Sequence, residues 1–260
     1  MKIGIMDGSL RQPWETLFAE AGTLGYDGVE LGVGADYADT ELFSAEGQRA
    51  LRKRAQTGGA ELASVCLHGF WQLSFASRDP EVIAQARQMA VAGTEAAANV
   101  GAKVILVPVT PAEGVEQEEG AERWIEQLRQ CAPAAEARGV VLAVENVGRG
   151  YGKAAADLLR IVEGVGSPCV GVYYDVGNAT YFGNDPVQEI GALGRHVAQV
   201  HTKERDAELL GEGTVKHAEA IAALQDIGYQ GYIMFETAAT EDPVAAARHN
   251  LAFVRGLLGG

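Results

Sequence analysis

The sequence predicts a (β/α)8 barrel formed by one domain over residues 1–260. Three observations predict this fold: a length of 260 residues, eight short apolar segments, and helix-like segments between them. Barrels of this class typically have about 250 residues. A strand followed by a helix, repeated along the chain, favours parallel pairing of the strands. No Pro-, Gly- or Ser-rich linker interrupts the pattern, which argues against two separate domains.

The predicted strands are short apolar runs, each about one strand–helix unit from the next. They cover residues 2–6, 28–31, 62–68, 103–109, 140–145, 170–176, 197–201 and 232–236. A doubly wound open sheet has the same strand–helix rhythm and is the alternative fold. The glycine-rich phosphate-binding fingerprints of nucleotide-binding sheets are absent, so the closed barrel is favoured.

Helix-like spacing is clearest over residues 80–99, 121–137 and 243–258. Two of these segments begin with Asp-Pro, at residues 79–80 and 242–243. Aspartate is a favoured N-cap residue, and proline is favoured in the first helical turn. Glycine follows several helical segments, where a helix commonly ends in a left-handed residue. These glycines are Gly101, Gly139 and Gly228.

The charge balance is acidic, with 21 Lys and Arg against 35 Asp and Glu and a formal charge of −14. A nucleic-acid-binding protein needs a basic surface that neutralises phosphates. The acidic charge also disfavours anionic membranes, and no apolar run approaches the roughly 20 residues of a membrane helix. We therefore expect neither a nucleic-acid nor a membrane partner.

The three cysteines, Cys66, Cys131 and Cys169, have the spacing of neither a metal site nor a disulfide framework. The first residues lead directly into a predicted strand and lack the pattern of a signal peptide. Free thiols and a cytoplasmic location are the resulting expectations.

Four consecutive predicted strands end in an ionisable residue. These residues are Glu145, Asp175, His201 and Glu236. The active site of such a barrel lies at the carboxyl ends of the strands, and neighbouring strands are about 4.8 Å apart. One carboxylate at a strand end is more often a helix cap or a surface charge, but four can converge on one cation. Three carboxylates and an imidazole suit Mn²⁺, Mg²⁺ or Co²⁺ better than a thiolate-preferring metal.

Further motifs stand beside these strand ends in a fixed order. They are Ser-Val-Cys-Leu at 64–67, Ser-Arg-Asp at 77–79, Leu-Ala-Val-Glu at 142–145, Asp-Val-Gly-Asn at 175–178, Val-His-Thr-Lys-Glu at 200–204 and Gly-Glu-Gly at 211–213. By these motifs the chain resembles the xylose-isomerase-like TIM-barrel sugar (phosphate) isomerase/epimerase superfamily, and within it the L-xylulose/L-ribulose-5-phosphate 3-epimerase branch. The resemblance covers most of the chain.

The resemblance implies a function and a cofactor. Glu145, Asp175, His201 and Glu236 match the residues that bind one divalent metal ion in this family. Mn²⁺ is the first candidate, with Mg²⁺, Co²⁺ or Zn²⁺ as alternatives. The implied reaction inverts C3 of a ketose or ketose phosphate through a metal-stabilised enediolate, with Glu145 and Glu236 as the acid/base pair. Relatives commonly form dimers or tetramers, so a homo-oligomer is a further implication.

Five residues near the strand ends are candidates for substrate contact: His68, Trp71, Asn178, Lys203 and Arg205. Ordinary packing would explain Trp71 equally well, and salt bridges would explain the two cations. Glu30, at the end of the second predicted strand, is a candidate for supporting a metal ligand. The resemblance is imperfect at Glu204, where the family often has aspartate. Asn178 replaces the histidine of the free-ketose 3-epimerases, which favours the pentulose-phosphate branch.

Other functions remain open at the sequence level. Aldose–ketose isomerisation, and dehydration or elimination on an inosose or an oxidised glycoside, would use the same metal site. All begin with abstraction of a proton next to a carbonyl. Abasic-site endonucleases share the barrel, but they need more histidine ligands than this chain offers. A non-catalytic sugar-binding protein is the remaining alternative, so a small sugar or sugar phosphate is the expected partner.

Overall fold

Eight parallel strands pair in chain order and close into a barrel, because β8 also pairs with β1. The computed structural model describes residues 1–238 and 240–259. Its strands are β1 (Lys2–Met6), β2 (Gly28–Val33), β3 (Glu61–Leu67), β4 (Val104–Pro108), β5 (Val141–Glu145), β6 (Val170–Asp175), β7 (Val197–Thr202) and β8 (Tyr232–Phe235). The predicted barrel is therefore confirmed, and the open sheet is wrong. Every predicted strand is present, with bounds that differ by a few residues.

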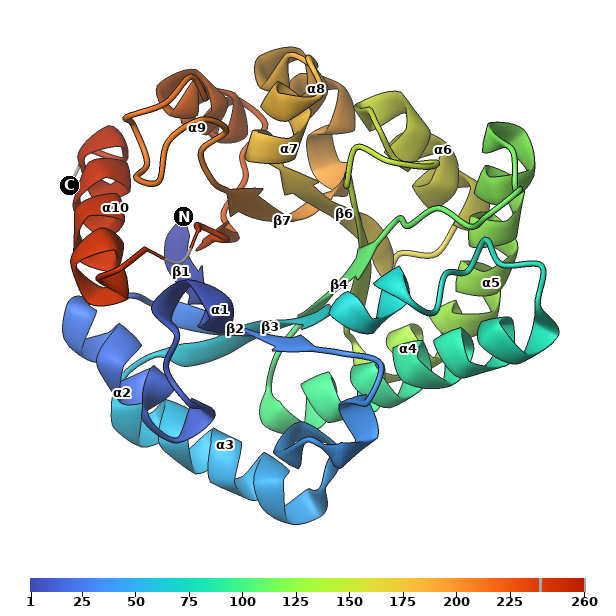
Figure 1. Cartoon of the computed structure of the whole chain (residues 1–260), viewed down its shortest axis with the longest axis horizontal. Helices are drawn as coiled ribbons and strands as arrows, with labels where there is room; N and C mark the ends of the chain where they lie inside the picture. The colour runs from blue at the N-terminus through green and yellow to red at the C-terminus, as the bar shows by residue number, and fades with distance from the viewer. Residues whose placement is uncertain (239, 260) are drawn as a thin grey trace.

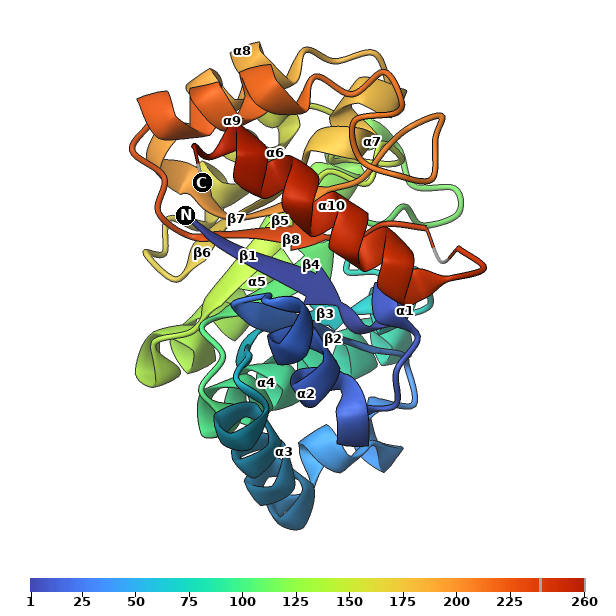
Figure 2. The ribbon, with the colours of Figure 1, turned by 90° about the vertical axis from the view of Figure 1, so that its left-hand side faces the viewer.

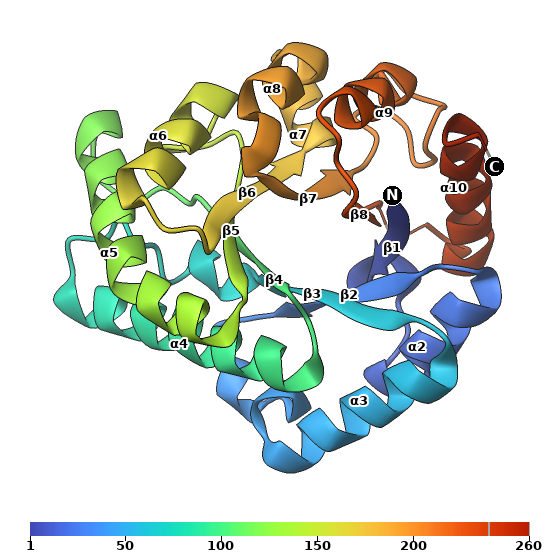
Figure 3. The same ribbon diagram turned by 180° about the vertical axis from the view of Figure 1, so that it is seen from behind.

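The helices form a ring around the strands, as the view along the barrel shows (Figure 1). They are α1 (Asp7–Leu10), α2 (Trp14–Leu24), α3 (Ala45–Gly58), α4 (Pro80–Val100), α5 (Gln117–Arg138), α6 (Ala155–Val165), α7 (Val176–Tyr181), α8 (Pro186–Leu193), α9 (His217–Asp226) and α10 (Pro243–Leu257). Short 3-10 turns are η1 (Tyr37–Asp39), η2 (Glu41–Phe43), η3 (His68–Trp71) and η4 (Gly194–His196). The opposite view shows the same ring from the other end of the barrel (Figure 3).

The expected helix ends are confirmed by their hydrogen bonds. Asp79 caps α4 by accepting from the backbone N–H of Glu81, and Asp242 caps α10 in the same way. Both caps satisfy N–H groups that have no partner within the helix. Gly101 and Gly139 end α4 and α5 with φ angles of 94° and 61°, in the left-handed region that glycine adopts most easily.

The barrel interior is divided into an apolar part and a polar part. The apolar part is a small cluster of side chains, separate from the larger core: Met6, Ala63, Cys66, Val104, Leu106, Ala143, Tyr173 and Met234. Gly4 makes room for Met234, since a Cβ atom at Gly4 would lie 2.1 Å from the Met234 sulfur. The larger core lies between the strands and the surrounding helices.

The carboxyl ends of the strands open at one end of the barrel. Figure 2 shows α1 and α7, which directly follow β1 and β6, at this end, and both chain termini at the other. Asp175 and His201 are direct partners in the register of β6 and β7. The fold therefore brings the polar strand ends together at the mouth. Among the described residues, no helix combines the length and apolar character needed to cross a membrane.

Helices α2 and α3 approach each other so closely that a side chain does not fit at Gly22. A Cβ atom there would lie 2.0 Å from the carbonyl oxygen of Gly58. We predict that Gly22→Ala lowers the free energy of unfolding by about 1–3 kcal/mol, as overpacking does. Thermal unfolding followed by circular dichroism measures the effect.

Gly191 in α8 is the matched control, because a Cβ atom there meets nothing within 4 Å. Gly191→Ala should raise the free energy of unfolding by about 0.5–1 kcal/mol, since alanine is the better helix former. Equal melting temperatures for the two variants would contradict the assigned helix contact.

Candidate active site

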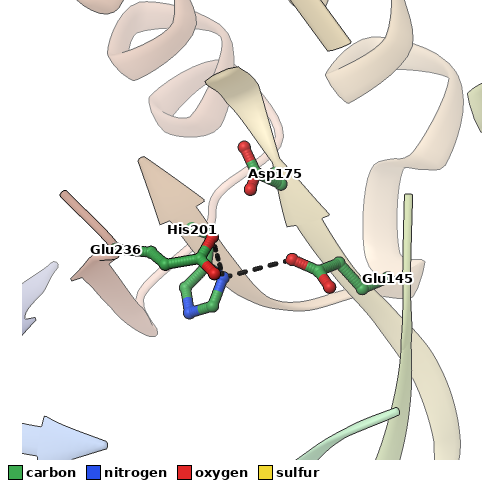
Figure 4. A group of neighbouring side chains, drawn as sticks. All are labelled: Glu145, Asp175, His201 and Glu236. Carbon is green, nitrogen blue, oxygen red and sulfur yellow. Dashed lines mark hydrogen bonds and ion pairs between the residues drawn. The ribbon is translucent and has the colours of Figure 1, made fainter. Parts of the chain in front are cut away.

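The four predicted metal ligands lie together at the barrel mouth (Figure 4). One ligand atom from each of Glu145, Asp175, His201 and Glu236 lies within 4.8 Å of the others. Glu145, Asp175 and His201 are buried, whereas Glu236 is half-buried. Each residue lies at the carboxyl end of one of four consecutive strands, β5 to β8. The strands are rigid supports, so the relative positions of the four side chains are set by the fold.

A hydrogen-bonded pair fixes the spacing between the ends of β5 and β6. The side-chain amide of Asn146 donates to the backbone oxygen of Asp175 at 2.8 Å, and the Asn146 oxygen accepts from the Asp175 N–H at 2.7 Å. Asn146 was not singled out from the sequence. Its position directly after Glu145, at the end of a strand, is the sequence feature that could have identified it.

Asp175 has two separate roles, because its two oxygens face different groups. Oδ1 accepts from the backbone N–H of Asn178 at 2.8 Å and so caps α7. Oδ2 is buried and makes no hydrogen bond; the ammonium of Lys203 lies 2.7 Å from it, but at angles outside those of a hydrogen bond. A buried carboxylate oxygen without a hydrogen bond is costly unless a cation compensates it. Helix capping and cation binding are therefore compatible at this residue.

The imidazole of His201 lies between carboxylates on both sides. Nδ1 lies 3.2 Å from Glu145 Oε1 and 3.4 Å from Glu236 Oε2, and Figure 4 shows the two glutamates approaching it from opposite sides. Nε2 lies 2.6 Å from Glu30 Oε1. Burial alone would lower the pKa of His201, but the charges of Glu30 and Glu236 and the bond to Glu145 raise it well above its usual value.

The two glutamates of the cluster differ in their proton affinity. Burial raises the pKa of Glu145 to about 7, although the hydrogen bond to His201 opposes the shift. Burial would also raise the pKa of Glu236, but His201 and Lys203 together lower it below its usual value. Carboxylates whose environments separate their pKa values form an acid and a base.

The residues of the cluster fit a divalent metal. Three carboxylates and one imidazole are the donors preferred by Mn²⁺, Mg²⁺ and related ions. One ligand atom from each of the four residues faces the same small space, as the donors around one ion would. The cluster could therefore hold one ion through the four residues predicted from the sequence.

A cavity of about 650 Å³ opens above the cluster. Its walls include Cys66, His68, Trp71, Pro108, Glu145, Val147, Arg149, Asn178, Tyr181, Phe182, Lys203 and Glu236. Four of the five predicted substrate contacts are among them. Arg205 is not; its guanidinium lies 5.5 Å from the centre of the Tyr181 ring, so it reaches the cavity wall only through that ring. The substrate roles of all five residues stay predictions.

Several residues of the cavity wall were not predicted from the sequence, among them Arg149, Tyr181 and Phe182. Arg149 lies in the loop after β5, between Gly148 and Gly150, which both have positive φ angles. Tyr181 and Phe182 lie at the end of α7 and are unusually exposed for large aromatic side chains. Gly148 leaves room for Phe182, because a Cβ atom there would overlap the ring. The only available signal was their place in loops that follow ligand-bearing strands.

Glu204 organises the loop that carries Lys203 and Arg205. Its buried carboxylate accepts from the N–H of Gly211 and from Nε2 of His217, both at 2.8 Å. A Cβ atom at Gly213 would lie 2.3 Å from the same carboxylate. The glutamate that departs from the usual family aspartate thus has a structural task in this chain.

Fold and site together define a (β/α)8 barrel with an acidic, histidine-containing cluster at its mouth that could hold a metal ion. Residues 18–257 match the family model described as "Xylose isomerase-like TIM barrel", and the chain belongs to this family. The resemblance seen in the sequence is thereby confirmed.

Named relatives extend over nearly the whole chain. The L-ribulose-5-phosphate 3-epimerase UlaE of Escherichia coli O157:H7 is 28% identical over 244 residues, covering 89% of this chain and 85% of the relative. D-psicose 3-epimerase of Clostridium cellulolyticum H10, solved with D-tagatose, is 22% identical with a TM-score of 0.87 and covers 99% of both chains. The 3-keto-D-glucoside 4-epimerase YcjR of E. coli is 21% identical with a TM-score of 0.83, covering 98% of this chain and 99% of the other. At these identities the two solved structures show a shared fold.

Lys203 is the lysine that counters the carboxylates of the cluster, with its Nζ 2.6 Å from Glu236 Oε2. We predict that Lys203→Met lowers the free energy of unfolding of chelator-treated protein by about 1–3 kcal/mol. This is less than for a fully buried pair, because the Lys203 and Glu236 side chains are each about a quarter exposed. Chemical unfolding in EDTA measures the difference.

The exposed Lys53 on α3 provides the matched control, and Lys53→Met should change the free energy of unfolding little. A Lys203→Met variant that is as stable as the wild type would show that this lysine does not compensate the cluster.

Proposed function

We propose that this chain is a divalent-metal-dependent epimerase that inverts C3 of a ketose or ketose phosphate. The observation that carries the proposal is the placement of Glu145 and Glu236 on opposite sides of one cluster, below one cavity. The epimerase name of the curated relative supports the same reaction class. Both glutamates line the cavity, so both can reach a bound substrate.

Epimerisation needs two proton carriers on opposite faces of one carbon. One glutamate removes the C3 proton, and the other returns a proton to the opposite face. When bound, a divalent metal supplies Lewis-acid stabilisation of the negative charge that develops on the substrate oxygens.

The remaining residues hold and surround the reacting groups. Asp175 and His201 serve as metal ligands, fixed by the helix cap and by Glu30 respectively. His68, Asn178 and Lys203 line the cavity near the glutamates and would contact substrate hydroxyls.

Two more residues act at the edge of the cavity. Trp71 is half exposed and would cover an apolar face of the sugar. Arg205 would contact the substrate from beside Tyr181, whose ring centre lies 5.5 Å from its guanidinium.

The finer assignments follow from the donor set and from the relatives. Mn²⁺ is the first candidate, and Mg²⁺, Co²⁺ or Zn²⁺ are alternatives, because oxygen ligands dominate the cluster. The proposed partner is a small sugar or sugar phosphate, and neither a nucleic acid nor a membrane is a proposed partner. The proposed location is the cytoplasm, and the protein would form a homo-oligomer. Isomerisation and elimination would use the same site and are outcomes of the first test below.

Proton exchange with solvent is the direct signature of the reaction. With Mn²⁺ in deuterated buffer, we predict that deuterium enters C3 of one ketopentose or ketohexose, free or phosphorylated, while the C3 epimer accumulates. NMR and mass spectrometry of the products measure both, and EDTA should abolish them until Mn²⁺ is restored. Exchange at C1 would indicate an aldose–ketose isomerase. Exchange at neither carbon of any sugar would favour elimination or dehydration on an oxidised sugar.

Removal of either proton carrier should stop turnover. We predict that Glu145→Gln and Glu236→Gln each lower turnover by roughly 10²–10⁴-fold, the range for loss of a general acid or base. Circular dichroism and one equivalent of bound Mn²⁺ would show that fold and metal site persist. The exposed Glu212 supplies the control, since Glu212→Gln should leave turnover unchanged. Near-normal turnover in both test variants with metal bound would exclude the two-glutamate mechanism.

A further inference from the structure

A buried polar network lies in the barrel interior, in contact with His201 and away from the cavity. It consists of Glu30, Ser64, Tyr173 and Gln199, on β2, β3, β6 and β7. Each of them is at most 2% exposed. None belongs to the metal-binding cluster, and none lines the cavity. Polar groups so deeply buried need complete hydrogen bonding, so the direction of each bond is informative.

Hydrogen bonds in this network run in one direction. The Gln199 amide nitrogen donates to the Ser64 hydroxyl at 2.6 Å and to the Tyr173 hydroxyl at 2.8 Å. Each hydroxyl then donates its own proton to Glu30 Oε2, at 2.6 Å from Ser64 and 2.8 Å from Tyr173. The chain of donors therefore ends on Glu30, since a carboxylate can only accept.

The other oxygen of Glu30 meets the metal-binding cluster. Oε1 lies 2.6 Å from Nε2 of His201, on the side of the ring opposite Glu145 and Glu236. A carboxylate that only accepts requires a proton on the nitrogen that faces it. The proton of a neutral His201 therefore resides on Nε2, and the lone pair of Nδ1 faces the other ligands.

We propose that Glu30 is a positioning residue that holds the His201 proton on Nε2 and thereby presents Nδ1 to a divalent metal. The inference rests on the proposed function, because it requires a metal at the cluster. Partners of this kind orient a ligating histidine and select its tautomer. Among the ion pairs of the described residues, Glu30 has no lysine or arginine partner, so His201 is its ring-nitrogen partner.

Glu30→Gln tests the proposal with almost no change in shape. The Ser64 and Tyr173 hydroxyls donate toward Oε2, so they would hold the new amide oxygen there. The amide NH₂ group would then face His201 and donate to Nε2, which moves the ring proton to Nδ1. We expect the Kd for Mn²⁺, measured by calorimetry on the full chain, to rise about 10–100-fold.

A second measurement reads the tautomer directly. In protein labelled with ¹⁵N-histidine and loaded with Mg²⁺, which is diamagnetic, the wild type should carry the His201 proton on Nε2. Metal-free Glu30→Gln should carry it on Nδ1. His201→Asn assigns the signal. A residue that only supports the fold would shift the melting temperature without moving this proton.

Two further variants distinguish the effect of the Glu30 carboxylate from that of its hydrogen-bond donors. Ser64→Ala removes one donor but leaves the Glu30 carboxylate against Nε2, so the Kd should change clearly less than in Glu30→Gln. Glu30→Asp keeps a group that only accepts, so the proton should stay on Nε2 even where the affinity falls. The melting temperature of each metal-free variant controls for folding.

The outcomes distinguish failure of this proposal from failure of the proposed function on which it rests. Wild-type protein that binds none of Mn²⁺, Mg²⁺, Co²⁺ and Zn²⁺ would overturn the proposed function and this inference together. Wild-type binding with an unchanged Kd in Glu30→Gln would overturn the inference alone. If Glu30→Gln does not fold, the wild-type spectrum decides, since an unprotonated Nε2 would contradict the proposal.

Discussion

The crowding of carboxylates around His201 is the constraint that the rest of the site must satisfy. Glu145, Asp175 and Glu236 face one small space, and Glu30 faces the other side of the same ring. Like charges at such distances repel strongly where water is excluded. The His201 imidazole and the Lys203 ammonium offset part of this negative charge, and the donor set suits a further cation. A closed parallel barrel can hold this arrangement because each acidic group extends from a different rigid strand.

Apolar and polar side chains lie beside each other inside the barrel, since Met6 is the strand partner of Glu30 and Met234 is that of His201. Met6, Met234 and their apolar neighbours form a cluster whose close packing stabilises the strands. Tyr173 belongs to both parts, since its ring packs in that apolar cluster and its hydroxyl donates to Glu30. The polar groups are therefore supported both by packing and by hydrogen bonds. Such support limits how far a ligand side chain can move, which a reaction with two opposed proton carriers requires.

The sequence was sufficient for the strands and for the four clustered residues, because both follow from periodicity and from the known end of the barrel at which sites lie. It was insufficient for contacts made between distant strands. Glu30 was a candidate for supporting a metal ligand, but no local pattern encodes its bond to His201, which joins β2 to β7. Loop conformations could not be predicted from the sequence either. Glu204 anchors its loop through Gly211 and His217, and this loop places Arg205 against Tyr181. Arg149 was not predicted because it also lies in a loop, the one after β5.

Strand ends carry the four clustered residues, whereas loops supply much of the cavity wall above them. The loop after β5 contributes Arg149, and the end of α7 contributes Tyr181 and Phe182. Loops tolerate substitution and changes of length far better than the strands they join. Divergence among descendants of one ancestral barrel can therefore redesign sugar preference while the proton-transfer apparatus is inherited intact. Selection for a new sugar would then change residues in the loops around the cavity, whereas purifying selection would conserve the strands.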